Sequence, residues 1–84
     1  MYYVYFLKSV NRNRFYVGYT TDLRKRFEKH NNKRVKSTAF YAPWELVYYE
    51  AYRDKLIATK RESELKIHAV KENLLSRLGL KSQQ

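Results

Sequence analysis

Two tyrosines near the N-terminus could place their phenol hydroxyls side by side. Tyr5 and Tyr16 belong to segments that alternate like β-strands, and Gly18 follows two residues after the second tyrosine. If the two strands form a hairpin that is symmetric about Val10–Asn11, Tyr5 lies directly opposite Tyr16. A glycine inside a strand often marks a spot where another group approaches the backbone closely. The pattern therefore predicts a shallow polar niche that a ligand could enter.

The alternative for these tyrosines is an ordinary strand role with their hydroxyls in water, because tyrosine favours strands. The same register pairs Val4 with Val17 and Phe6 with Phe15, which gives one apolar face for a core. Tyr3 would then share the opposite face with the other tyrosines.

Residues 24–36 carry seven cationic side chains and a single acid, Glu28. Leu23 and Phe27 supply an apolar stripe for a helix that Thr20, Thr21 or Asp22 could cap, so the cations must occupy the remaining faces. Such a surface suits phosphate contacts, and its alternative is a solvated helix face. Arg26 could steady charge on a reacting phosphate. The other cations that we expect to contact nucleic acid here are Arg24, Lys25, Lys29, Lys33, Arg34 and Lys36.

One carboxylate has an unusual position. If residues 55–69 are helical, Glu62 is the only charged member of a face that it shares with Ala58, Leu65 and Ala69. A carboxylate on the packing side of a helix is unfavourable unless a cation pairs with it, and a divalent metal would serve. A structural ion pair, for example with an arginine of the basic helix, is the alternative.

The composition restricts the metals and the partners. The chain has no cysteine and only two histidines, His30 and His68, so a bound metal must use carboxylate and water oxygens, which suits Mg²⁺ or Mn²⁺. Eighteen Lys and Arg against eight Asp and Glu give a net charge of +10, which favours a nucleic-acid partner. Because the sequence has neither a long apolar run nor the features of a signal peptide, we expect a cytoplasmic protein without a membrane partner.

The elements that must position these side chains form one domain, because the sequence contains no internal repeat and no linker composition. We expect this domain over residues 1–80 and a frayed tail at 81–84. The elements expected after the basic helix are a strand over 44–52, a helix from Asp54 to about Lys66, and a last helix from about Val70 that carries Leu74 and Leu78 and ends at Gly79.

Several blocks of the chain, in order, resemble the GIY-YIG nuclease family, in particular its small single-domain bacterial members. Tyr3-Val4-Tyr5 stands where the family has Gly-Ile-Tyr, and Tyr16-Val17-Gly18 stands where it has Tyr-Ile-Gly. The similarity continues through residues 16–31, 36–38, 43–50 and 60–66. Tyr3 replaces the glycine of the first motif, and we expect this change to narrow the niche.

The resemblance implies an α+β fold, with a three-stranded antiparallel sheet flanked by helices in the order β-β-α-β-α-α. It implies a metal-dependent endonuclease that hydrolyses phosphodiester bonds in DNA rather than RNA, with structured or damaged DNA and DNA repair among the expected settings. The catalytic residues that it implies are Tyr5, Tyr16, Arg26, His30 and Glu62, with Glu62 holding Mg²⁺ or Mn²⁺ and Lys66 joining the cations that contact nucleic acid.

In the implied mechanism Tyr5 positions or deprotonates the attacking water with help from Tyr16. A phenol can act as a base near neutral pH only if nearby cations depress its pKa. His30 would assist proton transfer or contact a phosphate. Two alternatives remain: a nucleic-acid-binding protein with the same fold and no catalysis, and a basic accessory protein of a ribonucleoprotein.

Overall fold

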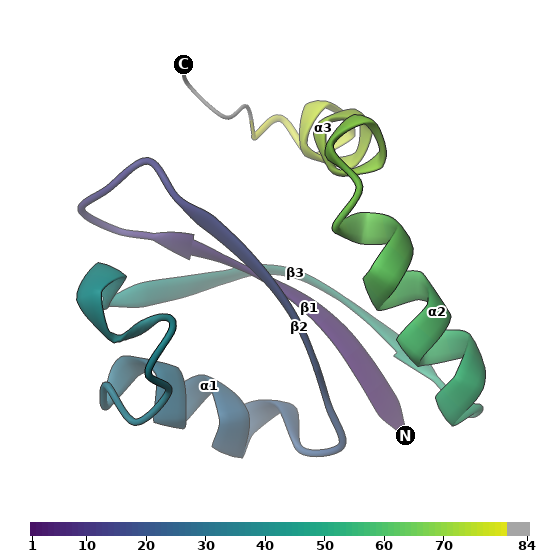
Figure 1. Ribbon diagram of the computed structural model, residues 1–84, viewed down its shortest axis with the longest axis horizontal. Helices are drawn as coiled ribbons and strands as arrows, with labels where there is room; N and C mark the ends of the chain where they lie inside the picture. The colour runs from purple at the N-terminus through teal and green to yellow at the C-terminus, as the bar shows by residue number, and fades with distance from the viewer. Residues whose placement is uncertain (81–84) are drawn as a thin grey trace.

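The computed structural model describes residues 1–80 and places a three-stranded antiparallel sheet between two helical layers (Figure 1). The strands are β1 (Tyr2–Ser9), β2 (Phe15–Thr20) and β3 (Trp44–Tyr52), and β1 is the central strand of the order β2-β1-β3. Helix α1 (Leu23–Asn31) lies on one side of the sheet, while α2 (Lys55–Leu65) and α3 (His68–Arg77) lie on the other. The expected fold class and element order are confirmed, with a short 3₁₀ turn, η1 (Ala39–Tyr41), added before β3.

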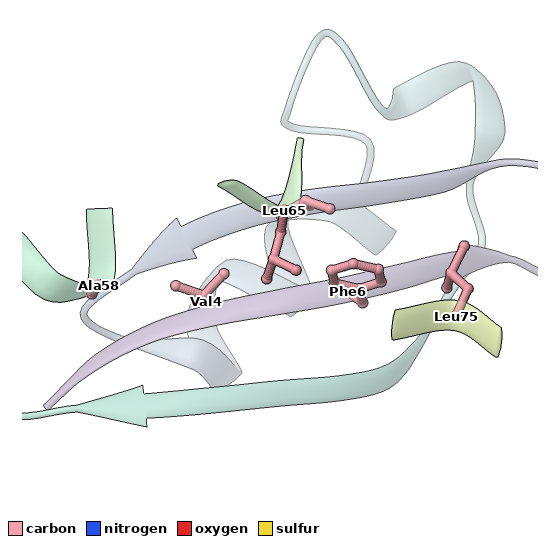
Figure 2. Close-up of a cluster of buried hydrophobic side chains, with 6 residues drawn as sticks. Val4, Phe6, Ala58, Leu65 and Leu75 are labelled. Atoms are coloured by element: carbon pink, nitrogen blue, oxygen red, sulfur yellow. The ribbon is translucent and has the colours of Figure 1, made fainter. Parts of the chain in front are cut away.

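The main apolar cluster fills the space between the sheet and the second helical layer. Alternation along β1 sends Val4 and Phe6 to this side, where they pack with Leu65 of α2 and Leu75 of α3 (Figure 2). Val17 of β2 joins them, so the apolar face expected for the hairpin is confirmed. Each fully buried side chain of this size contributes about 1.5–3 kcal/mol, which makes this face the main source of stability.

The register of the hairpin differs from the expected one. Tyr5 pairs with Gly18, and Leu7 pairs with Tyr16, so the partners are shifted by two residues from a hairpin symmetric about Val10–Asn11. Because side chains alternate with a period of two, this shift leaves every side chain on its expected face. Tyr5 and Tyr16 are therefore diagonal neighbours on one face rather than direct partners.

A buried serine explains the longer turn. The hydroxyl of Ser9 accepts a hydrogen bond from the backbone N–H of Arg12 at 3.2 Å and donates one to the carbonyl of Tyr41 at 2.7 Å. The backbone N–H of Ser9 also donates to the carbonyl of Arg14 at 2.9 Å, which closes a four-residue loop between them. The tertiary contact with Tyr41 lies far along the chain, so local turn preferences could not have indicated it.

Two aspartates begin the helices, as the sequence predicts. The carboxylate of Asp22 accepts the N–H of Lys25 at 3.1 Å at the start of α1. That of Asp54 accepts the N–H groups of Leu56 and Ile57 at the start of α2. These caps fix where each helix begins and therefore which of its residues face the sheet.

Helix α2 ends at Leu65, before Ala69, the last residue of the apolar face expected around Glu62. The N–H groups of Lys66 and Ile67 bond to carbonyls only three residues earlier, which tightens the last turn and ends the helix. The chain then turns and α3 begins at His68, so Ala69 is exposed on another helix. Ala58 and Leu65 are buried as expected, but the prediction of a continuous face reaching Ala69 is wrong.

The last helix begins at His68, two residues before the expected start, and ends at Arg77, followed by the C-cap Leu78 and by Gly79, whose φ of +73° fits the expected C-terminal stop. The tail expected at 81–84 lies outside the described residues. Among residues 1–80, no helix is long and apolar enough to cross a membrane.

Candidate active site

Tyr5 lies across the glycine of the second strand. A Cβ atom at position 18 would collide with the hydroxyl and ring carbon of Tyr5, so only glycine lets this ring cross β2 toward the edge of the sheet. The centroid of the Tyr5 ring is 6.3 Å from that of Tyr16, as expected for neighbours on one face. Tyr5 is only 1% exposed, whereas Tyr16 is half-buried. The prediction of an open niche is therefore wrong for Tyr5, and Tyr16 is the accessible phenol of the pair.

A histidine of α1 anchors the buried phenol. The hydroxyl of Tyr5 lies 2.8 Å from Nε2 of His30, and Nδ1 of His30 lies 2.7 Å from the hydroxyl of Thr38. The Thr38 hydroxyl also donates to the carbonyl of Val35 at 3.3 Å, so it must accept a proton from Nδ1. It follows that Nδ1 carries the imidazole proton and that Nε2 accepts the hydroxyl proton of Tyr5.

Burial keeps this histidine neutral. Desolvation lowers the pKa of His30 to about 4, and the positive charge of Arg26 acts in the same direction. The side chain is fully buried, with 0% exposure. A neutral, enclosed imidazole does not suit a phosphate contact, so of the two expected roles the geometry favours proton transfer.

Burial also dominates the titration of Tyr5. Desolvation raises the pKa of Tyr5 to about 12, and the proximity of Tyr16 and Glu62 adds to the increase. Arg26 acts in the opposite direction through its contact with the hydroxyl and its charge, but it does not reverse the sign. The condition under which a phenol acts as a base near neutral pH is therefore not met, and Tyr5 is a neutral phenol at pH 7.

Arg26 sits between the phenols and a basic hollow. Its interaction with the Tyr5 hydroxyl raises the pKa of the guanidinium, although partial burial acts against it. Its Nε atom is buried and has no hydrogen-bond partner among residues 1–80. The guanidinium lines a hollow of about 400 Å³ together with Lys25 and Lys29. A buried donor without a protein acceptor is unfavourable by itself and suits an incoming anionic oxygen.

Glu62 reaches this region from the other helical layer. Helix α2 contacts all three strands. The negative charge of Glu62 makes the smallest of the contributions that raise the pKa of Tyr5. Its carboxylate pairs with Lys66 one turn further along α2 at 3.1 Å, with the side chains 22% and 55% exposed, respectively. The alternative of a structural ion pair is thus present, with Lys66 as the partner of Glu62 in place of an arginine of α1. An ion pair between residues four apart on a helix surface contributes only about 0.3–0.5 kcal/mol to stability. A divalent cation could therefore displace the Lys66 ammonium from the Glu62 carboxylate.

The donor set around Glu62 decides which metal fits. Within residues 1–80 no three His, Cys, Asp or Glu side chains gather in a way that could hold a metal ion. Mg²⁺ and similar hard ions need no such cage, because they keep several waters and bind one or two carboxylates plus substrate phosphates. Glu62 offers one such carboxylate, so this donor set fits Mg²⁺ or Mn²⁺ and does not fit a metal that requires histidine or thiolate ligands.

The remaining predicted nucleic-acid contacts lie on α1 and on the loop that follows it, and all of these side chains are exposed. The ion pairs described among residues 1–80 join Arg61 to Glu50 and Lys66 to Glu62, which leaves the cations of α1 and its loop without acidic partners there. Lys25 and Lys29 line the hollow beside Arg26, and Arg24 lines a neighbouring one. The cations on the loop are Lys33, Arg34 and Lys36.

Thr38 belongs to this arrangement although no local feature of the sequence marks it as a site residue. Thr38 is 1% exposed, and its contacts with His30 determine which imidazole nitrogen faces Tyr5. Its backbone carbonyl also accepts the indole N–H of Trp44 at 3.0 Å, which fixes the loop against β3. The available signal was its place in the block 36–38, where a small hydroxyl residue follows the basic run.

One face of the sheet thus carries two phenols, a guanidinium with an unpartnered donor and a hollow lined by cations, an arrangement suited to an α+β domain that acts on phosphate esters. Residues 1–73 match the family model of the GIY-YIG catalytic domain. The chain therefore belongs to the GIY-YIG family, whose domain is a nuclease domain.

The relatives agree with this assignment. A UPF0213 protein from Staphylococcus epidermidis is 42% identical over 73 residues, which cover 86% of this chain and 88% of the relative. One from Streptococcus pyogenes is 42% identical over 65 residues, covering 76% and 70%, respectively. The solution NMR structure of a UPF0213 protein from Bacillus halodurans superimposes with a TM-score of 0.57 at 36% identity, covering 92% of this chain and 85% of that one. None of these names states an activity.

Proposed function

We propose that this protein is a divalent-metal-dependent endonuclease that hydrolyses phosphodiester bonds in DNA. The observation that carries the proposal is the position of Arg26, whose buried Nε lacks a protein acceptor and whose guanidinium lines a cation-rich hollow beside Tyr5 and Tyr16. A phosphate in that hollow would complete the hydrogen bonding of Arg26 and meet a phenol on one side and lysines on the other. Membership of a nuclease family supports the reaction class, and the choice of DNA rests on that membership alone.

Each residue has a distinct role in the proposed reaction. Arg26 neutralises the charge that builds on the phosphate oxygens, and its effect is large because the guanidinium is held in place before the reaction begins. Lys25 and Lys29 bind the flanking phosphates. Tyr16, the half-buried phenol, orients the attacking water. Glu62 would hold the divalent cation, which when bound polarises the phosphate and stabilises the leaving oxygen.

Tyr5 and His30 form a proton route behind this surface. With a pKa raised to about 12, Tyr5 does not stand as a base by itself. Its hydroxyl proton already points at the lone pair on Nε2 of His30. When bound substrate brings the reacting water to the phenol oxygen, that oxygen takes a proton and passes its own to Nε2. The imidazolium, with a pKa of about 4, then gives the proton up again, so neither a phenolate nor a charged His30 accumulates. This coupled transfer would explain why a neutral imidazole lies behind a neutral phenol.

The proposal is tested by incubating the purified protein with supercoiled plasmid in the presence and absence of Mg²⁺ or Mn²⁺. We expect nicking that needs the metal and that EDTA stops. Binding measured in EDTA should weaken with salt, with a slope reduced by about one unit for each lost phosphate contact when Lys33, Arg34 and Lys36 are replaced by alanine. Salt-dependent binding without turnover on any DNA or RNA would favour the alternative of a catalytically inactive nucleic-acid-binding protein. The compartment that we propose is the cytoplasm.

A further inference from the structure

A second hollow, of about 420 Å³, adjoins the cation-lined one on the same face. The two hollows share Thr21 and Asp22 at the start of α1. Their linings differ in kind, since the cation-lined hollow is polar throughout, with three cations beside two threonines and Asp22, whereas the second hollow presents mainly rings and aliphatic side chains. The apolar lining of the second hollow consists of Tyr3, Leu23, Phe27, Leu46 and Tyr49.

Two tyrosines form the sheet side of this second hollow. Tyr3 of β1 and Tyr49 of β3 meet edge to face, with ring centroids 6.1 Å apart and an angle of 62° between the rings. Tyr49 is 52% exposed, so much of this aromatic side chain remains in contact with water. An exposed tyrosine beside an apolar hollow can stack on a flat, unsaturated ring of a ligand without any rearrangement of the core.

We infer that this aromatic hollow seats one unstacked nucleobase, while the adjacent basic hollow holds a phosphate of the same strand. The inference rests on the proposed function and specifies its substrate class. Charge and shape agree with this occupant, because a nucleotide joins a flat ring to an anion, and the surface joins an aromatic hollow to a cationic one. Arg24 borders the aromatic hollow, and the Asp22 carboxylate at the boundary is engaged by the N–H of Lys25.

The occupant must be unpaired at this position. In a duplex the faces of the bases are covered by their neighbours, and only the base edges are open to a protein. A single strand, a flap or a gap offers a face for stacking at little cost, because no pairing has to be broken. The substrate that fits both hollows therefore carries at least one unpaired nucleotide next to the phosphate bound by Arg26.

The test compares Tyr49→Ala with Tyr49→Phe. Both variants lack the hydroxyl, and only Tyr49→Phe keeps the aromatic ring. The probe is a single-stranded DNA oligonucleotide that contains one 2-aminopurine, whose fluorescence falls when it stacks, and binding is measured in EDTA. The parent protein and Tyr49→Phe should quench the probe and bind with similar affinity. Tyr49→Ala should bind about tenfold more weakly and lose most of the quenching, as loss of one base–aromatic stack predicts.

The matched substrate control is a fully paired duplex of the same sequence, on which all variants should bind within about twofold of the parent. Equal loss on single strand and duplex would overturn the inference, as would unchanged quenching and affinity in Tyr49→Ala. Tyr49→Leu, which keeps apolar bulk without a π-face, gives the same comparison if the alanine variant unfolds, and thermal unfolding of each protein checks this.

The readout in EDTA does not depend on cleavage, so the two proposals can fail separately. A protein that stacks the probe through Tyr49 and never cuts DNA would retain the base site and lose the proposed function. A protein that nicks plasmid with Mg²⁺ and shows no effect of Tyr49 would retain the function and lose the base site.

Discussion

Two groups of residues contain the same side-chain types: two tyrosines, one arginine and one glutamate. In the cluster under α2, Glu50 accepts hydrogen bonds from the hydroxyls of Tyr48 and Tyr52, and Arg61 reaches it with two nitrogens at 2.8 and 3.0 Å. Although burial raises the pKa of Glu50, these contacts outweigh it and lower the value to about 2. Both carboxylate oxygens, both hydroxyls and two guanidinium nitrogens of this cluster thus have partners within it.

The cluster beside α1 is open. Arg26 has a buried Nε without a partner in residues 1–80, and Glu62 is paired only with an exposed lysine. Tyr5 is bound to His30, but Tyr16 remains half-exposed beside it. Residue types therefore do not separate a structural cluster from a functional one. The difference is whether the polar atoms have already been satisfied within the protein, because only unsatisfied ones can gain energy from a substrate.

The largest expected effect comes from removing the negative charge of Glu62, the carboxylate of the open cluster. Glu62→Gln should reduce the single-turnover cleavage rate by about a thousandfold, because a neutral amide holds a divalent cation poorly. Binding of the same DNA in EDTA should change by less than about threefold. Glu64→Gln, a neighbouring carboxylate on α2, is the matched control and should cut at the parental rate. A Glu62→Gln protein that cuts as fast as the parent would remove this residue from the site.

The equivalent substitution in the closed cluster should act on stability instead. Glu50→Gln should reduce the free energy of unfolding at pH 7 by about 3 kcal/mol, because the carboxylate has a pKa of about 2 when folded and an ordinary one when unfolded. A depressed pKa stabilises the fold above the unfolded pKa, and this stabilisation is lost as the pH falls from about 5 to about 2. Urea unfolding at pH 7 and pH 3 measures it.

In that experiment the parent protein should lose stability on acidification, and Glu50→Gln should lose about 2 kcal/mol less between pH 7 and pH 3, where the folded carboxylate is still largely ionised. Its cleavage rate per folded molecule should match that of the parent. Parallel pH profiles for the two proteins would show that Glu50 is not the carboxylate that couples stability to pH.

Replacing the arginine of each cluster extends the comparison, and the expected effect on cleavage or stability is somewhat smaller. Arg26→Ala should slow cleavage on the order of a hundredfold, equivalent to about 2.7 kcal/mol of transition-state stabilisation, as loss of one preorganised donor to a reacting oxyanion does. Arg61→Ala should leave cleavage per folded molecule unchanged and lower the unfolding midpoint. The assay is single-turnover cleavage at saturating protein, with the folded fraction measured by circular dichroism. A loss below threefold for Arg26→Ala would exclude it from the reaction.

The sequence predicted local features of the fold better than tertiary ones. Caps at Asp22 and Asp54 and the stop at Gly79 follow from local backbone chemistry, and the structure contains them. The faces of the hairpin were correct because they depend only on alternation, whereas its register was wrong because Ser9 holds the turn through a contact with Tyr41. The end of α2 near Lys66 agrees with the prediction, whereas the face drawn from Ala58 to Ala69 assumed one helix across that end, and no glycine or proline marks the break.

For the candidate site, residue types and the resemblance identified the side chains that gather on the α1 face, and their catalytic roles remain proposals. What the sequence could not give were the consequences of burial. The raised pKa of Tyr5 and the lowered pKa of His30 both follow from desolvation, which depends on how the helix covers the sheet. The network around Glu50 was missed for the same reason, since its partners come from β3 and α2 together.

The smallest expected effect concerns Thr38. This residue lines neither the basic nor the aromatic hollow, and it acts through its contact with His30. Thr38→Val keeps the shape of the side chain and removes the acceptor for the Nδ1 proton. We expect cleavage to fall about tenfold, as loss of a group that orients a functional histidine typically does, and Thr38→Ser to restore it. Ser37→Ala, an exposed neighbour, should have no effect.

A merely structural threonine would produce the same loss of rate if the variant were partly unfolded, so the tautomer of His30 is the deciding measurement. In the parent protein the ¹⁵N shifts of His30 should report a proton on Nδ1 and a bare Nε2, because Thr38 accepts from one nitrogen and Tyr5 donates to the other. In Thr38→Val the proton should move toward Nε2, which then competes with the Tyr5 hydroxyl instead of accepting from it. Slower cleavage with an unchanged tautomer would mean that Thr38 supports the fold alone, and that the open cluster ends at His30.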